Sequence, residues 1–148
     1  GQIQGSEPEI YRVYPQGNYI TTSPHTPFLQ IGESKYGKPI LDRIIMPSTP
    51  LGDATRCALV SIDSTMRSNL TVGPPIEVFV YEADSFAFDH YLCLEADNDY
   101  LRSLTHAWDD NIKKAFVDLP RFDWEAAGGR KKRGTQFHLS KRARKAAR

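Results

Sequence analysis

Two parts of the chain alternate between hydrophobic and polar residues, a pattern typical of β-strands. Residues 10–14 and 19–22 are rich in aromatic and β-branched side chains and flank the turn sequence Pro-Gln-Gly-Asn, so they predict a β-hairpin. The segments IEVFVYE (residues 76–82) and DHYLCLEA (residues 89–96) predict a second pair of strands. A further short strand is expected over residues 28–31.

Two segments between these hairpins have hydrophobic residues at helical spacing. The first covers residues 34–45, and Pro39 must lie in its first turn because proline has no N–H to donate. The second begins with Thr49 as the expected N-cap and Pro50 as the first helical residue, and it runs to about Asn69.

A third helix follows the second hairpin. It is expected to be capped within residues 97–99 and to end before Pro120. One face carries an apolar stripe, which we interpret as packing against the core. The stripe consists of Leu101, Leu104, Trp108, Ile112, Ala115 and Leu119.

The segment GESKYGKP (residues 32–39) is one residue short of the phosphate-binding pattern G-x-x-x-x-G-K-[ST]. That pattern needs a Ser or Thr hydroxyl on Mg²⁺ and a row of backbone N–H groups around the phosphates. Pro39 supplies neither, and Glu33 places a carboxylate where phosphates would lie. The segment therefore predicts a tight turn from a strand into a helix, and not a nucleotide site.

Composition places the chain among single-domain globular proteins. It has 148 residues, of which 40% are hydrophobic and 25% charged. No apolar run reaches the ~20 residues of a membrane span, and no signal peptide is recognisable, so we expect a cytoplasmic protein that does not bind membranes. Cys57 and Cys93 are interpreted as buried free thiols. The four histidines lack metal-ligand spacing, and we expect neither a metal nor a cofactor.

The net charge of +1 conceals an asymmetry. Residues 125–148 hold nine Lys or Arg and one acid, whereas residues 1–124 hold ten Lys or Arg and seventeen acids. We expect an acidic folded part and a basic, disordered tail. The tail is either a solubilising extension, which we favour, or a segment that attracts nucleic acid electrostatically.

Polar residues crowd the end of the second predicted helix, in the segment SIDSTMRSNLTVG (residues 61–73). They are typical of a fraying helix end, where Arg67 is favourable near the negative end of the helix dipole. The alternative is a hydrogen-bonded cluster that supports a site. Composition favours the first interpretation.

Several long stretches resemble one known family. They are YPQGNYI, TPFLQIGESKYGKPILDRII, CALVSIDSTMRSNLTVGPPIEVFVYE and AFVDLPRFDW. In this order they are similar to Anbu, the bacterial proteasome-type peptidases related to HslV and to proteasome β subunits. The resemblance covers nearly all of residues 1–124, and the basic tail lies outside it.

The resemblance implies an N-terminal-nucleophile hydrolase with an α+β fold, a four-layer αββα sandwich of two antiparallel sheets between helix layers. A Thr or Ser at the mature N-terminus attacks the peptide carbonyl, its own α-amino group acts as the base, and an Asp and a Lys tune it. None of the three lies in this chain, because Gly1 aligns with an interior strand. The chain is thus similar to the C-terminal part of such a subunit, without the N-terminal strands.

The resemblance also suggests supporting residues at the turn. The superfamily has a Gly-Ser-Gly turn whose serine lies near the amine of the nucleophile. Gly32 matches the first glycine, and either Glu33 or Ser34 stands at the serine, depending on a shift of one residue. Ser34 would keep the hydroxyl role, whereas Glu33 would act as an alternative proton acceptor.

A second group follows the long helix. Proteasome β subunits place an Asp and, three residues later, a Ser-Gly pair there. Matching Gly73 to that glycine puts Asn69 at the Asp and Val72 at the Ser, and valine cannot donate a hydrogen bond. The serine role is then expected at Ser68 or Thr71. Asp63 and Arg67 are expected to support these residues without contacting the substrate themselves.

Three functions remain open from the sequence. The first is the C-terminal part of a threonine- or serine-type peptidase subunit that hydrolyses peptides or proteins and is inactive without its N-terminal half. The second is a non-catalytic assembly subunit of the same fold. The third, ranked last, is nucleic acid binding through the tail. The resemblance implies self-association into a ring or a helical homo-oligomer, and the unpaired sheet edge predicts poor solubility for the chain alone.

Overall fold

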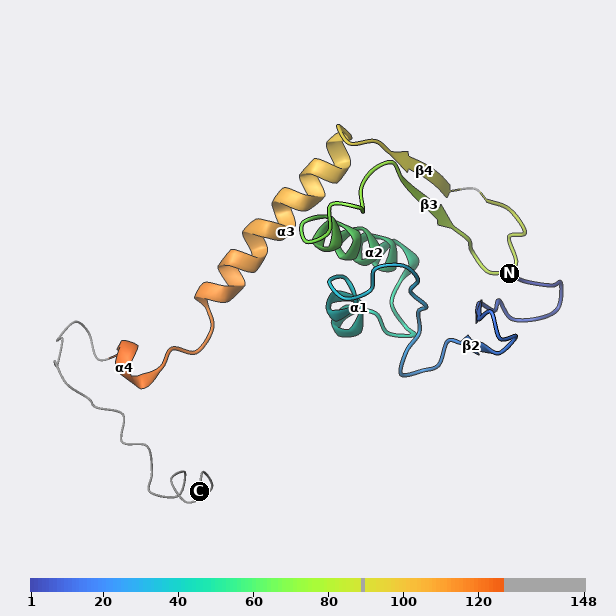
Figure 1. Ribbon diagram of the computed structural model, residues 1–148, viewed down its shortest axis with the longest axis horizontal. Coiled ribbons are helices and arrows are strands. Elements are labelled where there is room, and N and C mark those ends of the chain that lie inside the picture. Colours follow the sequence, from blue (N-terminus) through green and yellow to red (C-terminus); the bar gives the residue numbers. More distant parts are fainter. Residues whose placement is uncertain (89, 127–148) are drawn as a thin grey trace, which may run out of the picture. The chain divides into compact units, whose positions relative to one another are not determined.

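The computed structural model describes residues 1–88 and 90–126 (Figure 1). The chain divides between residues 113 and 114 into two compact units, each of which is described by itself. The described elements are β1 (Tyr11–Val13), β2 (Tyr19–Thr21), α1 (Lys38–Ile44), α2 (Leu51–Met66), β3 (Ile76–Val80), β4 (His90–Leu94), α3 (Asp99–Val117) and α4 (Asp123–Ala126). Helices and antiparallel strand pairs in this order confirm the α+β class.

Both predicted hairpins are confirmed. β1 pairs with β2 in antiparallel register, with Arg12 opposite Ile20, and the turn at Gly17 has the positive φ of 87° that favours glycine. β3 pairs with β4, with Val78 opposite Leu92. Each sheet has two strands within the described residues. Isolated two-stranded hairpins are marginally stable, so each one needs another surface to pack on.

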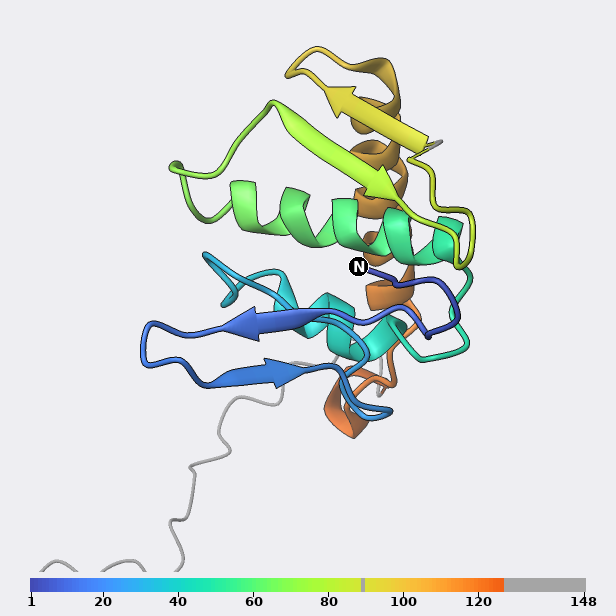
Figure 2. The same ribbon diagram turned by 90° about the vertical axis from the view of Figure 1, so that its right-hand side faces the viewer.

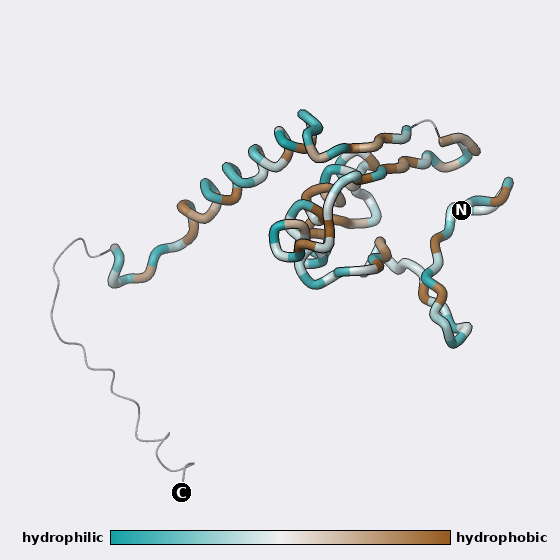
Figure 3. Tube along the Cα trace, turned by 45° about the horizontal axis from the view of Figure 1, so that its top comes forward, coloured by the Kyte–Doolittle hydropathy of each residue, from teal (hydrophilic) through white to brown (hydrophobic). Residues whose placement is uncertain are grey.

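The second hairpin packs on α2. In Figure 2, β3 and β4 run across one side of α2, and Figure 3 shows brown, hydrophobic positions in both strands between teal, hydrophilic ones. Four buried residues form this core: Leu59 from α2, Ile76 from β3, Leu94 from β4 and Leu101 from α3. Alternation explains the arrangement, because Ile76 and Val78 point to the same face of β3.

The start of α2 differs from its prediction by one residue. Pro50 is the N-cap and Leu51 the first helical residue, whereas Thr49 was expected to cap the helix. Thr49 instead turns backward: its Oγ1 accepts a hydrogen bond from Met46 N at 2.8 Å and lies 3.4 Å from Ile44 O. The hydroxyl therefore closes the turn after α1, and α2 begins without a side-chain cap.

The third helix begins as expected but its stripe is only partly buried. Asn98 Oδ1 accepts a hydrogen bond from Leu101 N at 3.1 Å, which satisfies a free N–H of the first turn. Leu101 is buried and Trp108 half-buried, but Ile112 is 46% exposed. Ile112 is therefore not part of the buried core of its unit, contrary to the interpretation of the whole stripe.

Two other expectations differ from the structure, and one lies outside the residues that it describes. Residues 28–31 form no strand, because no described segment pairs with their backbone. Cys57 is buried as expected, whereas Cys93 is exposed, since its position on β4 faces away from α2. The basic tail, apart from its first two residues, lies outside the described residues. None of the described helices is both long and apolar enough to cross a membrane.

Candidate functional site

The turn before α1 owes its shape to two glycines. Gly32 has a φ of 72°, which is strained for any residue with a side chain. Gly37 is buried against α2, and a Cβ there would lie 2.7 Å from Ser61 O and would collide with the Ser61 hydroxyl. The first glycine reverses the chain, and the second brings α1 close to α2.

The carboxylate of Glu33 joins this turn to the loop after α2. Its Oε1 accepts a hydrogen bond from Lys35 N at 2.8 Å, and its Oε2 accepts a long one from Asn69 Nδ2 at 3.5 Å. Asn69 is itself held in place, because its Oδ1 accepts hydrogen bonds from Thr71 N at 3.0 Å and from Thr71 Oγ1 at 2.7 Å. The structure therefore brings together Glu33, Asn69 and Thr71, three of the residues singled out in the sequence.

A cleft of about 380 Å³ lies beside this contact. Its walls are the segment before the turn, one residue of α1, the second half of α2 and the loop that follows α2. Most of its lining is apolar, and Glu33 lies at its polar side. The lining residues are Leu29, Gln30, Ile31, Glu33, Leu41, Ala58, Ser61, Ile62, Thr65 and Val72.

Two other candidates are outside this arrangement. Ser34 follows Glu33, but it does not line the cleft, and its carbonyl oxygen accepts a hydrogen bond from Lys38 N at 3.1 Å. Ser68 is exposed and does not line the cleft either. Of the two residues that compete for the position at the turn, Glu33 is thus the one that faces the cleft. Val72, the aligned residue without a donor, forms part of the apolar wall.

Polar residues of α2 divide between two sides of the helix. Ser61 and Thr65, four positions apart, face the turn at Gly37, and Thr65 Oγ1 donates to Ser61 O at 2.9 Å. Asp63 and Arg67, also four positions apart, face α3. The crowded helix end is therefore two sets of contacts and not one cluster. Neither Ser61 nor Thr65 was singled out as a site residue, and only the close approach of Gly37 identifies their side.

Asp63 is the main polar contact between α2 and α3. Its buried carboxylate accepts hydrogen bonds from Thr105 Oγ1 at 3.0 Å and from Arg67 Nε at 3.2 Å. Arg67 also donates to Asp109 Oδ2 at 2.8 Å. Desolvation opposes the charge of Arg67, but the two carboxylates outweigh it and raise the pKa of the guanidinium. These contacts hold two helices together.

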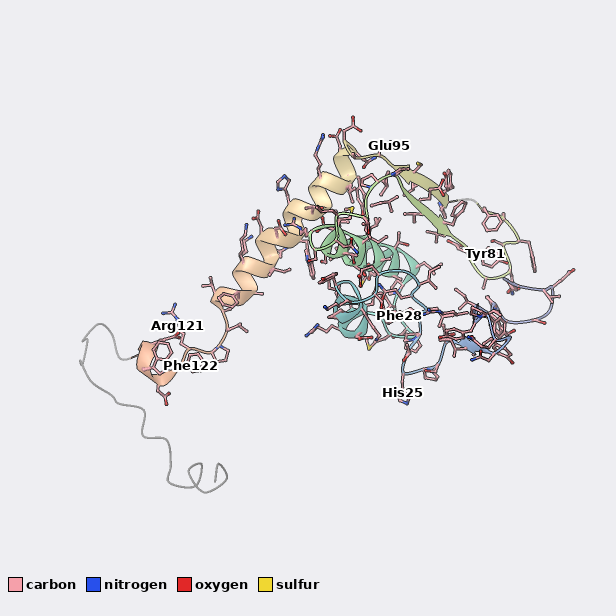
Figure 4. All side chains as sticks on the ribbon, viewed as in Figure 1. His25, Phe28, Tyr81, Glu95, Arg121 and Phe122 are labelled. Atoms are coloured by element: carbon pink, nitrogen blue, oxygen red, sulfur yellow. The ribbon has the colours of Figure 1, made fainter. Side chains whose placement is uncertain are left out.

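Lys38, the lysine of the apparent phosphate loop, is already paired. Its Nζ lies 2.5 Å from Asp42 Oδ1, one turn further along α1, and 5.4 Å from the centre of the Phe28 ring. Figure 4 labels Phe28 beside α1. Pro39 lies in the first turn of the helix, as expected. The lysine is thus paired with a carboxylate, and Glu33 occupies the Lys35 N–H, so neither group is arranged as the phosphate-binding pattern requires.

The site combines an apolar cleft, which can bind apolar side chains, with the carboxylate of one residue, which can accept hydrogen bonds. Glu33 presents that carboxylate at the cleft, with Asn69 as a donor and Thr71 as its support. The described residues contain no group of three His, Cys, Asp or Glu side chains that could hold a metal ion. The arrangement therefore offers a carboxylate and an amide donor beside an apolar cleft.

Comparison with solved structures identifies relatives of this chain. It is similar to "Anbu (ancestral beta-subunit)" from Yersinia bercovieri, with 44% identity and a TM-score of 0.78, over 82% of this chain and 51% of that one. Anbu from Hyphomicrobium sp. strain MC1 shares 47% identity with this chain, with a TM-score of 0.78, and the match covers 82% of this chain and 52% of that one. The subunit in the helical assembly of the Anbu complex from Pseudomonas aeruginosa shares 48% identity with this chain, with a TM-score of 0.77. The match covers 82% of this chain and 50% of that one.

The chain spans about half the length of these relatives. No family model matches it. The search of curated proteins also found no match. Identity at this level across most of the described residues confirms the resemblance seen in the sequence.

Proposed function

Because this chain belongs to the Anbu family and matches the C-terminal part of its members, we propose that it is one portion of a proteasome-type subunit that hydrolyses peptide bonds. The observation that carries the proposal is 44–48% identity to Anbu proteins over 82% of the chain. In the proposed enzyme the nucleophile is a Thr or Ser at the mature N-terminus of the remaining portion. Its α-amino group acts as the base.

The contact between Glu33 and Asn69 supports this proposal. The wider superfamily places a supporting serine at a glycine turn, proteasome β subunits place further supporting groups in the loop after the long helix, and the two corresponding loops of this chain meet. Glu33 takes the role of the turn serine and accepts a proton from the N-terminal ammonium, so that the neutral amine can take the proton of the attacking hydroxyl. Asn69 orients the carboxylate, and Thr71 holds Asn69. Asp63 and Arg67 act indirectly, because they fix α2 against α3.

The proposed fold of the complete subunit is the four-layer αββα sandwich. Exposed apolar side chains on the two hairpins support it. Phe79 is 60% exposed on β3, and Phe88 is 73% exposed in the loop before β4. Further strands would cover such a surface and extend both two-stranded sheets.

Self-association is part of the proposal. The relative from Pseudomonas aeruginosa was solved as a helical assembly. We expect the complete subunit to form a homo-oligomer, a ring or a helix, in the cytoplasm.

The test uses a reconstituted subunit. The portion of the P. aeruginosa Anbu subunit that this chain does not match, called here the complementing segment, is fused before Gly1 so that its mature N-terminus is free. We expect this protein to hydrolyse fluorogenic peptides, and replacing its N-terminal Thr or Ser by Ala should abolish the activity. A folded reconstituted subunit that hydrolyses none of a broad peptide set would support the non-catalytic assembly role instead.

A further inference from the structure

The charges of the chain divide sharply between its folded part and its basic tail, residues 125–148. Residues 1–124 hold seventeen acids and ten Lys or Arg, whereas the tail holds nine Lys or Arg and a single acid, Glu125. A segment of this composition attracts polyanions. The stretches that resemble Anbu end at Trp124, and the solved Anbu structures match 82% of the chain. The charge of the tail is therefore a feature that the proposed peptidase function does not explain.

Two aromatic side chains lie directly before the tail. The rings of Phe122 and Trp124 are stacked, with 5.2 Å between their centroids and 10° between their planes. Both are largely exposed, Phe122 to 66% and Trp124 to 73%. They belong to the second compact unit, which begins at Lys114 and includes the tail. Exposed aromatic faces beside cationic residues are the surface on which unpaired nucleobases stack.

Phe122 also lines a hollow of about 600 Å³ in the same unit. Its other lining residues include Phe116 and Leu119, which are apolar, and the cationic Arg121. Figure 4 labels Arg121 and Phe122 in the segment that leads into α4. Glu125 is the acid in the lining, and its Oε2 accepts a hydrogen bond from Phe122 N at 3.2 Å. The hollow therefore offers apolar surface for a base, next to the aromatic pair and before the cations of the tail.

We propose that the basic tail and the pair Phe122 and Trp124 form a binding site for single-stranded nucleic acid of any sequence. The cations of the tail neutralise phosphates, and unpaired bases stack on the two rings. The rings favour a single strand over a duplex, because the bases of a duplex are stacked on one another and leave no faces free. This site is independent of the proposed peptidase function, and neither requires the other.

The position of Asp123 favours nucleic acid over an acidic membrane surface. Asp123 lies between the two aromatic residues in the sequence and is exposed. Insertion of both rings into a bilayer would carry this carboxylate toward the hydrocarbon, which costs free energy for a charged group. Base stacking leaves the same carboxylate in water. Vesicles that contain acidic lipid are therefore a competing ligand in the test.

The experiment measures binding of the full 148-residue chain, carried on a soluble fusion partner whose own binding is measured separately. The ligands are labelled oligo(dT) and oligo(U) of equal length, a duplex of that length, and vesicles of phosphatidylcholine with phosphatidylserine. The tail variant replaces four cations by glutamine: Arg130→Gln, Lys131→Gln, Lys132→Gln and Arg133→Gln. The control makes four such changes at exposed residues of the first unit, for the same net charge: Lys35→Gln, Arg43→Gln, Arg102→Gln and Lys113→Gln.

We expect both oligonucleotides to bind, with an affinity that falls steeply with salt. For single strands the slope of log K against log salt is about −0.7 per neutralised phosphate, so nine cations allow a slope of up to about −6. The tail variant should make the slope shallower by about 3 and weaken binding about tenfold or more. The control should change the affinity by less than about threefold, since its cations lie outside the site.

Trp124→Leu tests the aromatic part of the site, because leucine keeps apolar bulk but has no ring. Single strands should quench the fluorescence of Trp124 in the unchanged chain. The variant should lose that quenching and bind single strands about fivefold more weakly or worse. Binding to vesicles would not show this loss, since leucine also inserts into bilayers.

Five results would overturn the proposal. They are no binding of either oligonucleotide, a salt slope near zero, equal losses in the tail variant and the control, unchanged binding by Trp124→Leu, and tighter binding to the duplex or to vesicles than to single strands. Binding of oligo(dT) alone or of oligo(U) alone, with the expected losses in both variants, supports the site and shows which sugar it accepts.

Discussion

The side-chain amide of Asn69 donates a hydrogen bond to the carboxylate of Glu33 across 3.5 Å, joining positions 36 residues apart. One residue lies in the turn before α1 and the other in the loop after α2. The turn contributes Glu33 and the loop contributes Val72 to the lining of a largely apolar cleft. The contact between Glu33 and Asn69 therefore holds the two loops together at the edge of the cleft.

Glu33 is expected to take part in proton transfer. In the reconstituted subunit, Glu33→Gln keeps the size and the hydrogen-bonding shape of the side chain but removes the carboxylate. We predict a fall in kcat/KM of about 100-fold, within the range of general acid–base catalysis. The measurement is steady-state hydrolysis of a fluorogenic peptide.

Ser34→Ala is the matched control for Glu33, because both residues compete for the same aligned position. Ser34 does not line the cleft, so its loss should change kcat/KM by less than about threefold, as for a residue that does not stabilise the transition state. A large loss with Ser34→Ala and none with Glu33→Gln would reverse the assignment.

Gly37→Ala should destabilise the fold strongly. The added Cβ would lie 2.7 Å from Ser61 O and would collide with the Ser61 hydroxyl, so α1 and α2 must separate. We predict a loss of about 2–3 kcal/mol in the free energy of unfolding, typical of overpacking. Gly52→Ala on α2 meets open space and should instead stabilise by up to about 1 kcal/mol. Urea denaturation of both variants would show opposite shifts, and equal shifts would contradict the close helix contact.

Asp63→Ala should separate α2 from α3. The change leaves Thr105 and Arg67 without their shared acceptor, and about 2–3 kcal/mol of stability should be lost. Asp110→Ala is the control, because Asp110 is exposed and its ion pair with Lys113 is long, at 3.9 Å. Such surface pairs contribute ~0–1 kcal/mol. Equal effects of the two changes in chemical denaturation would show that Asp63 does not join the helices.

The two cysteines should react at different rates. Cys93 is exposed, whereas Cys57 is 4% exposed and burial raises the pKa of its thiol. A thiol reagent such as DTNB should modify one cysteine rapidly and the second only after denaturation. Cys93→Ser should remove the rapid phase, and a rapid phase that persists would place Cys57 at the surface.

The raised pKa of Cys57 also predicts a pH dependence. Because the folded-state pKa lies above the ordinary value of 9.0, the neutral thiol contributes its stability fully below pH 9. That contribution is lost as the pH rises through the folded-state value. Cys57→Ala should show a weaker loss of stability above pH 9 than the unchanged chain, and identical profiles would argue against a buried thiol.

Local patterns predicted most of the elements. Turn residues and alternating hydrophobic positions predicted both hairpins. The backbone chemistry of proline predicted Pro39 in the first turn of α1, and capping residues predicted the start of α3. The two errors have different physical origins. Thr49 was expected to cap α2 but closes the preceding turn, because its hydroxyl can serve either of two neighbouring local contacts. Residues 28–31 were expected to form a strand but find no partner among the described residues, and strand pairing depends on other segments, which local propensity does not contain.

The candidate site was only partly predictable. The resemblance to Anbu pointed to Glu33, Asn69 and Thr71, which the structure brings together, and also to Ser34 and Ser68, which it leaves outside.

The most direct test of the account is to locate the nucleophile chemically. The 148-residue chain and the complementing segment are prepared as two separate polypeptides and combined into a complex. A peptide that carries an electrophilic group reactive toward N-terminal nucleophiles is added, and the mass of each polypeptide is measured by mass spectrometry. The account predicts that the complementing segment gains the mass of the inhibitor at its N-terminal residue and that the 148-residue chain stays unmodified. An adduct on the 148-residue chain, or none on either polypeptide of a folded complex, would contradict it.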